Sequence, residues 1–420
     1  MGKSAVVIGG SLAGLMHGIM LGRHGYDVTI LELEDSAHVR EGFDAGIRAG
    51  PHVLNFLSKY DRTGRKFDIP ATGPQFIKKS GDMLFASKTA QAMSSWGLLM
   101  SILRANFDGS SSKAVPNPPK FGDDVPKGTF KHGARVISVE EMEDNVRVEF
   151  EDTVIEKTSS ILGDLVIVAD GANSSIRRSL VPGIVRQYAG YVSWRGTIKE
   201  DQVPVEHRKF FQHSVLYHFM DRSIVVGYVI PTDDGDLEEG KRLYNFVWYT
   251  NLPEDSPQYN RTMTDKDGKL HHGTVPRGSV RPDVWEVQRQ VAKRTMPPFL
   301  ATVVENTPAP FVTKVHNASS TKAVFFHDKL FIVGDALFGL RPHIGEATNQ
   351  AAYHCELMEE VVQGKLAPIQ WEHQVLRWGH AKQMLSIAFG ALALGTKVEL
   401  AYAGLQYLFL LIRQRLGYSS

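Results

Sequence analysis

Two aspartates follow short apolar runs of this chain, at positions that suit the binding of a ligand. Residues 330–333 are apolar and are followed, after one glycine, by Asp335; residues 165–169 are apolar and run directly into Asp170. Short apolar runs bounded by turn residues predict buried strands. In open α/β sheets, ligands bind at the carboxyl ends of the strands. Both aspartates are therefore candidate ligand-binding residues, although a strand followed by an aspartate without function gives the same local pattern.

A strand, turn, helix and second strand at the start of the chain predict a dinucleotide site. Residues 6–8 are apolar, residues 12–23 have helical spacing of apolar residues, and residues 28–31 form a second apolar run. Such a unit brings backbone N–H groups and a helix N-terminus to a pyrophosphate. The turn contains Gly9, Ser11 and Gly14.

Two residues of this unit bear on which dinucleotide it binds. Ser11 stands where the usual G-x-G-x-x-G fingerprint has its second glycine, and Glu32 ends the second strand. Serine is small and its hydroxyl can donate to a phosphate, so the site is retained. The carboxylate of Glu32 can accept hydrogen bonds from ribose hydroxyls and disfavours a 2′-phosphate. The unit therefore favours NAD or FAD over NADP at this place, without deciding between them.

Composition narrows the classes of function. The chain has 420 residues, which favours two domains, and a formal net charge of +1 without a basic block, which argues against a nucleic-acid partner. Cys355 is the only cysteine, so an intramolecular disulfide is impossible and a reducing compartment is expected. The paired His271 and His272 lack a third ligand pattern, so no metal site is predicted. We expect a cytoplasmic protein.

The C-terminus carries two apolar runs, residues 384–395 and 400–412. Each is shorter than the roughly 20 residues that a membrane-spanning helix needs. One interpretation is two helices that pack on the core or on a second subunit, which would make a homodimer. The alternative is a helix lying on a membrane surface, with Arg413 and Arg415 at its edge.

Three motifs occur along most of the chain. They are the glycine-rich turn, a D-G-x-x-S-x-x-R motif at Asp170, Gly171, Ser174 and Arg177, and a Gly-Asp motif at Gly334 and Asp335. Together and in this order they resemble the single-component, FAD-dependent aromatic monooxygenases, the family of para-hydroxybenzoate hydroxylase. The stretches "YAGYVSWRG" and "GDA-F…RPH" look like the branch of dihydroxypyridine hydroxylase and its fungal relatives, which often act on phenols in secondary metabolism.

The resemblance implies roles for individual residues toward FAD. Asp335 would bond the ribityl chain, Pro342 would lie beside the isoalloxazine, and the following helix would point its N-terminus at the flavin N1–C2=O edge. Glu346 departs from the family pattern, and we expect it to face solvent. The remaining expected flavin contacts are Gly46, Ile47, Arg104, Gly345, Ala347 and Asn349.

Arg195 is the first candidate on the substrate side. It ends an aromatic strand, two residues after Ser193 and so on the same face, where a cation could hold a phenolate and keep its ring electron-rich. Tyr217, Tyr228 and His343 are further candidates for contact with the substrate. A structural role remains the alternative for each of these residues.

The resemblance implies an enzyme with FAD as cofactor and NADPH or NADH and O₂ as co-substrates. Through a flavin C4a-hydroperoxide it would insert one oxygen into an electron-rich aromatic, phenolic or related small molecule. No second glycine-rich βαβ unit is present, so the nicotinamide cofactor is expected to lack a domain of its own. A flavin oxidase or oxidative cyclase on the same fold, and a flavin-binding protein without turnover, are the alternatives.

The expected architecture is an α/β fold in three parts. A Rossmann-like FAD-binding domain is discontinuous and comprises residues 1–184 and 316–384. β-branched and aromatic runs separated by turns predict a mainly antiparallel substrate-binding domain at residues 185–315. Apolar helices complete the chain at residues 385–420.

Overall fold

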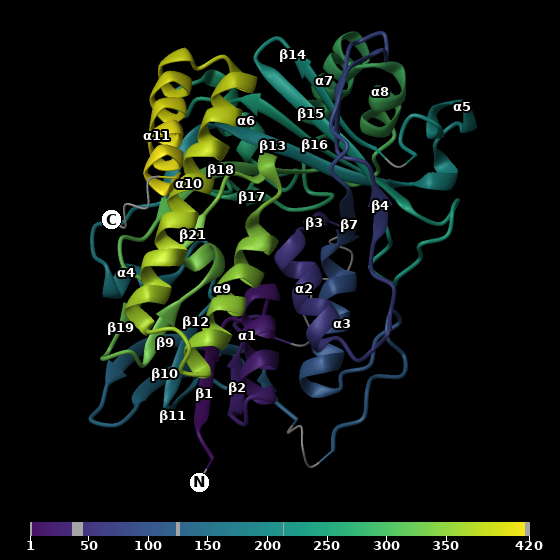
Figure 1. Cartoon of the computed structure of the whole chain (residues 1–420). Coiled ribbons are helices and arrows are strands. Elements are labelled where there is room, and N and C mark those ends of the chain that lie inside the picture. The colour runs from purple at the N-terminus through teal and green to yellow at the C-terminus, as the bar shows by residue number, and fades with distance from the viewer. Residues whose placement is uncertain (1, 36–44, 123–126, 213, 416–420) are drawn as a thin grey trace.

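A mainly parallel sheet forms the lower half of the molecule in the view of Figure 1. The structure, a computed structural model, describes residues 2–35, 45–122, 127–212 and 214–415. Apart from the antiparallel edge pair β19–β20, neighbouring strands of the sheet are parallel. The strand order is β19 (Val324–Phe325), β20 (Leu330–Ile332), β12 (Leu165–Val168), β1 (Ser4–Ile8), β2 (Asp27–Leu31) and β8 (Thr129–Lys131).

The parallel sheet has the buried strands that its apolar runs predict. Every residue of β12 is buried, as are the last four residues of β1. Strands covered on both faces need continuous apolar sequence, which these segments have. The helices packed around this half are α1 (Leu12–Arg23), α2 (Pro51–Tyr60), α3 (Trp96–Asp108) and α9 (Ala347–Val362).

A mainly antiparallel sheet forms the upper half of the molecule (Figure 1). The helices α7 (Pro282–Thr295) and α8 (Pro298–Glu305) pack near it, and Trp285 of α7 stacks on Phe246 of the sheet. The short β21 (Phe338–Gly339) also pairs with β18. The strand order is β17 (Thr274–Val275), β18 (Phe311–Ser319), β13 (Gln187–Lys199), β16 (Leu243–Asn251), β15 (Ser223–Ile230), β14 (Val215–Met220), β5 (Pro74–Ile77) and β6 (Met83–Ala86).

The predicted fold class is confirmed. Two elements cross the expected division into domains. Strands β5 and β6 lie in the segment assigned to the first domain, yet β5 pairs with β14 and so extends the antiparallel sheet. Helix α10 (Pro368–Leu394) runs without a break across the expected limit at residue 385. The limits themselves stay a prediction.

The chain ends in the long α10 and the helix α11 (Lys397–Arg415), which lie side by side (Figure 1). Among the described residues, no helix is both long and apolar enough to cross a membrane. The remaining elements are two small sheets, β3–β7–β4 (Gly46–Ala49, Gln91–Ser95, Ile69–Ala71) and β9–β10–β11 (Ala134–Glu141, Val146–Asp152, Lys157–Gly163), and the short helices α4 (Ser175–Leu180), α5 (Val205–Arg208) and α6 (Pro257–Met263).

Candidate active site

Four predicted residues lie at one edge of the parallel sheet. In the sheet register, Ile8 of β1 is opposite both Leu31 of β2 and Val168 of β12, and Val168 is opposite Ile332 of β20. The four strands therefore end at the same level. This alignment brings together the residues that follow the strands, which are Gly9, Glu32, Asp170 and Asp335.

Backbone geometry explains the glycines of the first turn. Gly9 has a φ of +102°, in the left-handed region that favours glycine. A Cβ atom at Gly9 would collide with the carbonyl oxygen of Ala169, and one at Gly14 would collide with the carbonyl oxygen of Gly9. Ser11 is the N-cap of α1, and its side chain makes no capping hydrogen bond. The first amides of α1 and the Ser11 hydroxyl can therefore donate hydrogen bonds to an anion.

The carboxylate of Glu32 is fixed against this turn. Its Oε2 atom accepts a hydrogen bond of 2.6 Å from the amide of Gly10, and its Oε1 atom accepts one of 3.0 Å from the amide of Glu34. Each carboxylate oxygen has two acceptor sites, so capacity remains for ribose hydroxyls.

The second motif is tied to the third through a buried arginine. Arg177 is 1% exposed and donates to the carbonyl oxygens of Ala336 and Ala172, at 2.7 and 2.8 Å. Ala336 directly follows Asp335, so Arg177 joins the two motifs. Asp170 accepts from the amide of Ser175 at 3.1 Å through one oxygen, while its other oxygen, Oδ1, is buried without a partner among the described residues.

Arg104 lies near the glycine turn and lines a different pocket from Arg195. Its guanidinium pairs with Asp108 at 2.7 Å and covers the ring of Phe130, 3.7 Å from the ring centroid. The Phe130 ring in turn lies against Gly10, where a Cβ atom would strike it. The contact of Arg104 with FAD stays a prediction.

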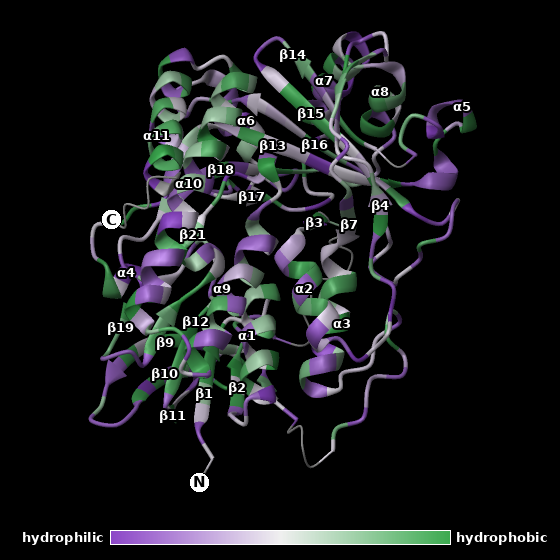
Figure 2. Cartoon of the chain, in the orientation of Figure 1, coloured by the Kyte–Doolittle hydropathy of each residue, from purple (hydrophilic) through white to green (hydrophobic). Residues whose placement is uncertain are grey.

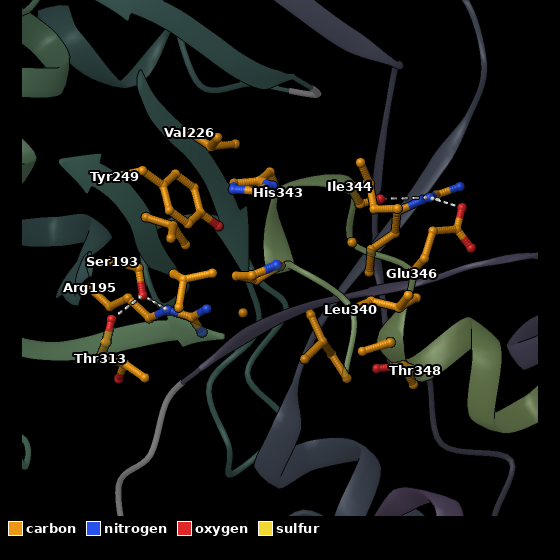
Figure 3. A pocket seen from close by; sticks show the side chains of 18 of the residues that line it. Ser193, Arg195, Val226, Tyr249, Thr313, Leu340, His343, Ile344, Glu346 and Thr348 are labelled. Atoms are coloured by element: carbon orange, nitrogen blue, oxygen red, sulfur yellow. Dashed lines mark hydrogen bonds and ion pairs between the residues drawn. The ribbon is translucent and has the colours of Figure 1, made fainter. Parts of the chain in front are cut away.

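A cavity of about 570 Å³ lies between the two sheets. Strands β13 to β16 and β18 supply one wall; β3, the turn at residues 339–346 and the start of α9 supply the other. In Figure 3, Arg195, Ser193 and Thr313 gather on one side, and Ile344, Glu346 and Thr348 lie across from them. The predicted residues that line it are Gly46, Ile47, Arg195, Tyr217, Tyr228, Asp335, Pro342, His343, Gly345 and Ala347.

Arg195 lines this cavity and has no carboxylate partner among the described residues. Its Nε atom donates to Ser193 Oγ at 3.3 Å. Two other cations of the cavity are paired, Arg48 with Glu346 and Lys314 with Glu254. Arg186 donates to Asn173 Oδ1 at 2.7 Å, and Asp335 is the nearby carboxylate that affects its pKa. An unpaired guanidinium in a closed space favours an anionic ligand.

The tyrosines of the cavity remain protonated at neutral pH. Burial raises the pKa of Tyr217 to about 12, and burial also raises the pKa of Tyr228 and Tyr249, partly offset by Arg195. Their hydroxyls can therefore exchange hydrogen bonds with a ligand but supply no negative charge.

His343 is neutral and directs its polar edge away from the open space. Burial, followed by the charges of Arg341 and Arg195, lowers its pKa to about 3. Its Nε2 atom lies 2.7 Å from the hydroxyl of Tyr191, and a Cβ atom at Gly390 of α10 would meet Cε1 and Nε2 at 2.7 and 3.1 Å. The imidazole edge thus faces α10, which leaves the ring as a wall of the cavity.

Close packing explains the residues expected at the flavin edge. A Cβ atom at Gly46 would lie 2.5 Å from the ring of Tyr228, so only glycine fits there. Gly345 has a φ of +62° and links a short 3₁₀ turn to the start of α9. Asn349 uses its side chain within the protein, since it accepts from the amide of His52 at 3.0 Å and donates to Glu346 at 2.9 Å.

The expectation that Glu346 faces solvent is wrong. Glu346 is 8% exposed and pairs with Arg48 at 3.1 Å and with Lys382 at 3.3 Å (Figure 3 shows the first pair). These partners could not be predicted from the sequence, because they lie in β3 and α10, far from Glu346 along the chain. The two cations compensate a carboxylate at the start of α9, where the resemblance expects the flavin N1–C2=O edge.

Replacement of Glu346 by glutamine is expected to raise the two-electron reduction potential of the bound flavin by roughly 20–40 mV. Without the carboxylate, the charge of Arg48 and the α9 N-terminus would act uncompensated and stabilise anionic reduced flavin. The potential is measured by equilibration with a reference dye. Glu356→Gln, an exposed position on the same helix, is the control, and an equal potential in both variants would contradict the prediction.

The residues present fit FAD. The glycine turn presents the first amides of α1 to a pyrophosphate. Asp170 has an orphaned buried oxygen, and the Asp335 carboxylate lines the cavity without a hydrogen bond from the described residues. These features suit the phosphate and hydroxyl groups of a dinucleotide that ends in the cavity.

The cavity wall also contains residues that sequence reasoning did not single out, among them Arg48, Arg186, Tyr249 and Lys314. The position of Tyr249 could have been predicted from strand alternation. Phe246 and Trp248 of β16 pack in one hydrophobic cluster, and Val247 and Tyr249 lie on the opposite face of the strand. The three cations carried no such signal, since surface cations are common in any sequence.

Known proteins are similar to this chain over most of its length. A family profile described as "FAD binding domain-like" matches residues 188–317. The 2,6-dihydroxypyridine 3-monooxygenase of Paenarthrobacter nicotinovorans is 26% identical over 381 residues, which are 89% of this chain and 87% of that protein. The solved structure of 2,6-dihydroxypyridine-3-hydroxylase from Arthrobacter nicotinovorans has a TM-score of 0.74 at 23% identity and covers 94% of this chain and 93% of its own. HpxO of Klebsiella pneumoniae, solved with FAD and uric acid, has a TM-score of 0.65 at 20% identity and covers 99% of this chain and 94% of its own.

The fold, the site and these similarities are those of an FAD-dependent monooxygenase. The chain is similar to the aromatic hydroxylases, the class that includes para-hydroxybenzoate hydroxylase. Within that class the chain is similar to 2,6-dihydroxypyridine 3-monooxygenase. FAD is its cofactor, and NAD(P)H is the reductant typical of the class.

Proposed function

We propose that the protein hydroxylates a small, electron-rich phenol or hydroxylated heteroaromatic that it binds as an anion. The observation that carries the proposal is Arg195, which lacks a carboxylate partner in a cavity walled by aromatic and aliphatic side chains. The similarity of the chain to an enzyme named for a dihydroxypyridine supports an acidic aromatic hydroxyl on the substrate. The expected setting in secondary metabolism stays a prediction.

Bound FAD would supply the activation of O₂ and the transfer of one oxygen atom to a ring carbon. The chain's own residues would hold and orient the ring. Arg195 would bind the substrate oxygen and favour its ionised form, which makes the ring more reactive toward an electrophilic oxygen. Tyr228 and Tyr249 would keep their protons and donate to polar atoms of the substrate, and Val226 and Val247 would help to exclude water.

Isotope labelling tests the proposed activity. The purified enzyme is offered a panel of phenols and hydroxypyridines under ¹⁸O₂ with NADH or NADPH, and products are identified by mass spectrometry. One ¹⁸O atom per product molecule, with one NAD(P)H consumed, is the expected result. An unlabelled oxidised product would favour an oxidase or cyclase, and absence of turnover with every compound would favour a flavin-binding protein.

A further inference from the structure

One face of the antiparallel sheet lines the cavity and continues beyond it. Val215 of β14, Pro74 of β5 and Ser87, which follows β6, all line the cavity. They form one row across the sheet, because Val215 is opposite Pro74 in the register and the amide of Ser87 donates to the carbonyl oxygen of Pro74 at 2.9 Å. Side chains two positions apart along a strand lie on the same face. The next row on this face therefore extends the wall of the cavity.

That next row is aromatic in all three strands. Tyr217 is opposite Phe76, and Phe76 is opposite Phe85. The ring centroid of Phe76 lies 5.2 Å from that of Tyr217 and 6.0 Å from that of Phe85. Tyr217 also lines the cavity, whereas Phe85 at the edge of the sheet is 61% exposed. The row thus runs from the cavity to the surface of the protein.

Two further rings border this row. Phe219, two positions after Tyr217 on β14, stacks on Phe76 with 5.9 Å between the ring centroids. Phe389 of α10 lies 6.0 Å from Tyr217 and 6.1 Å from Phe219, again between centroids. Figure 2 shows hydrophobic residues along β14 and β15 in this upper part of the molecule. We call the five residues the aromatic shelf: Phe76, Phe85, Tyr217, Phe219 and Phe389.

The shelf leaves aromatic surface in water, unlike the other face of the same sheet. On that other face, Leu216 and Trp248 pack in a hydrophobic cluster with Phe299 of α8. On the shelf, Phe219 remains 37% exposed in addition to Phe85. Aromatic side chains bury a large apolar area when they are covered, and exposed apolar patches mark sites where a ligand or partner binds.

We propose that the aromatic shelf binds an apolar substituent, an alkyl or alkenyl chain, of the aromatic substrate whose ring lies in the cavity. The inference rests on the proposed hydroxylation in that cavity. Continuity supports this occupant, because Tyr217 belongs both to the cavity wall and to the shelf. A two-residue step along a strand is about 7 Å, so a methyl group stays within the cavity and a chain of several carbons reaches Phe76 and Phe85.

Binding of alkyl resorcinols tests the proposal. Resorcinols with a methyl or a heptyl chain are titrated into the holoenzyme, and the change in flavin absorbance gives the dissociation constants. A fully buried methylene strengthens binding about threefold to fourfold. Because the shelf is partly open to water, the heptyl compound is expected to bind on the order of 30-fold more tightly than the methyl compound.

Substitutions on the shelf should lower this ratio of dissociation constants. In Phe219→Ala and Phe85→Ala we expect a ratio below about 10, because part of the apolar surface is lost. Phe210→Ala is the control and should keep the wild-type ratio, since Phe210 is 36% exposed and stacks on Phe299 at the opposite face. A wild-type ratio near one, no binding of the heptyl compound, or an equal fall in the control would overturn the proposal.

Thiol labelling locates the substituent independently of affinity and turnover. The native Cys355 is 1% exposed, so Phe85→Cys supplies the reactive thiol. The heptyl compound, and not resorcinol, is expected to slow the modification of this thiol by N-ethylmaleimide, while Phe210→Cys reacts equally with either compound present. Equal reactivity of Phe85→Cys with both compounds would contradict the proposal. Protection without any compound, by raised protein concentration or by phosphatidylcholine vesicles, would assign the shelf to a second copy or to a membrane and overturn it.

The shelf and the proposed function are separated by combining these measurements with isotope labelling. Labelled product from the resorcinols together with a ratio near one would reject the shelf and retain the hydroxylase. Preference for the heptyl chain and protection of Phe85→Cys, without labelled product from any compound, would support the shelf and reject the proposed hydroxylation.

Discussion

Arg195→Ala is expected to lower kcat/KM for substrate oxygenation roughly 10- to 150-fold while the protein keeps its FAD. Losing a charge-assisted hydrogen bond to a bound anion costs about 1.5–3 kcal/mol, and each 1.4 kcal/mol is a factor of ten. The variant should also consume NAD(P)H without matching product, because a poorly held ring does not capture the activated oxygen. Product and NAD(P)H are quantified in the same reaction.

Two control variants separate binding of the substrate from general damage. Arg195→Lys keeps the charge but loses the planar fork, so an intermediate effect is expected. Lys314→Met removes a cavity cation that Glu254 already compensates, so a smaller effect on coupling is expected. A flavin-loaded Arg195→Ala enzyme with wild-type rate and coupling would show that Arg195 is structural, and Tyr228 would become the better candidate.

Asp335→Asn is expected to weaken FAD binding by a similar factor of roughly 10 to 150, because the neutral amide loses the charge that strengthens a hydrogen bond to a sugar hydroxyl. The wild type should also show a pH dependence. Burial raises the pKa of Asp335 to about 6, with Arg186 acting in the opposite direction. Above pH 6 the carboxylate is ionised and accepts hydrogen bonds; below pH 6 it becomes protonated, so FAD affinity should fall.

Titration of apoprotein with FAD between pH 5 and 8, followed by flavin fluorescence, measures both effects. The Asn variant should lack the change in affinity near pH 6. Asp164→Asn is the matched control, since Asp164 lies at the opposite end of β12, where it accepts hydrogen bonds from Ser4. Wild-type affinity in Asp335→Asn would remove Asp335 from the FAD site.

Elements specified by neighbouring residues could be predicted from the sequence alone. Helical spacing predicts the first helix at residues 12–23, and α1 spans those residues. The apolar runs at 6–8, 28–31, 165–169 and 330–333 all contain strands of the parallel sheet. Apolar periodicity and small-residue turns act over a few positions, so they are visible without tertiary contacts. The strand-end positions of Gly9, Glu32, Asp170 and Asp335 followed from the same local pattern.

Tertiary structure alone decided which charged groups are compensated and which are free. Arg48 and Glu346 are 298 positions apart, and Arg341 and Glu399 are 58 apart, so no local pattern announces either pair. The same pairing leaves Arg195 in the cavity without a carboxylate partner among the described residues. Packing on α10 likewise turned the polar edge of His343 away from the cavity. These outcomes depend on how strands and helices from distant parts of the chain meet, because burial and partner choice are properties of the packed fold and are absent from the order of residues in any one segment.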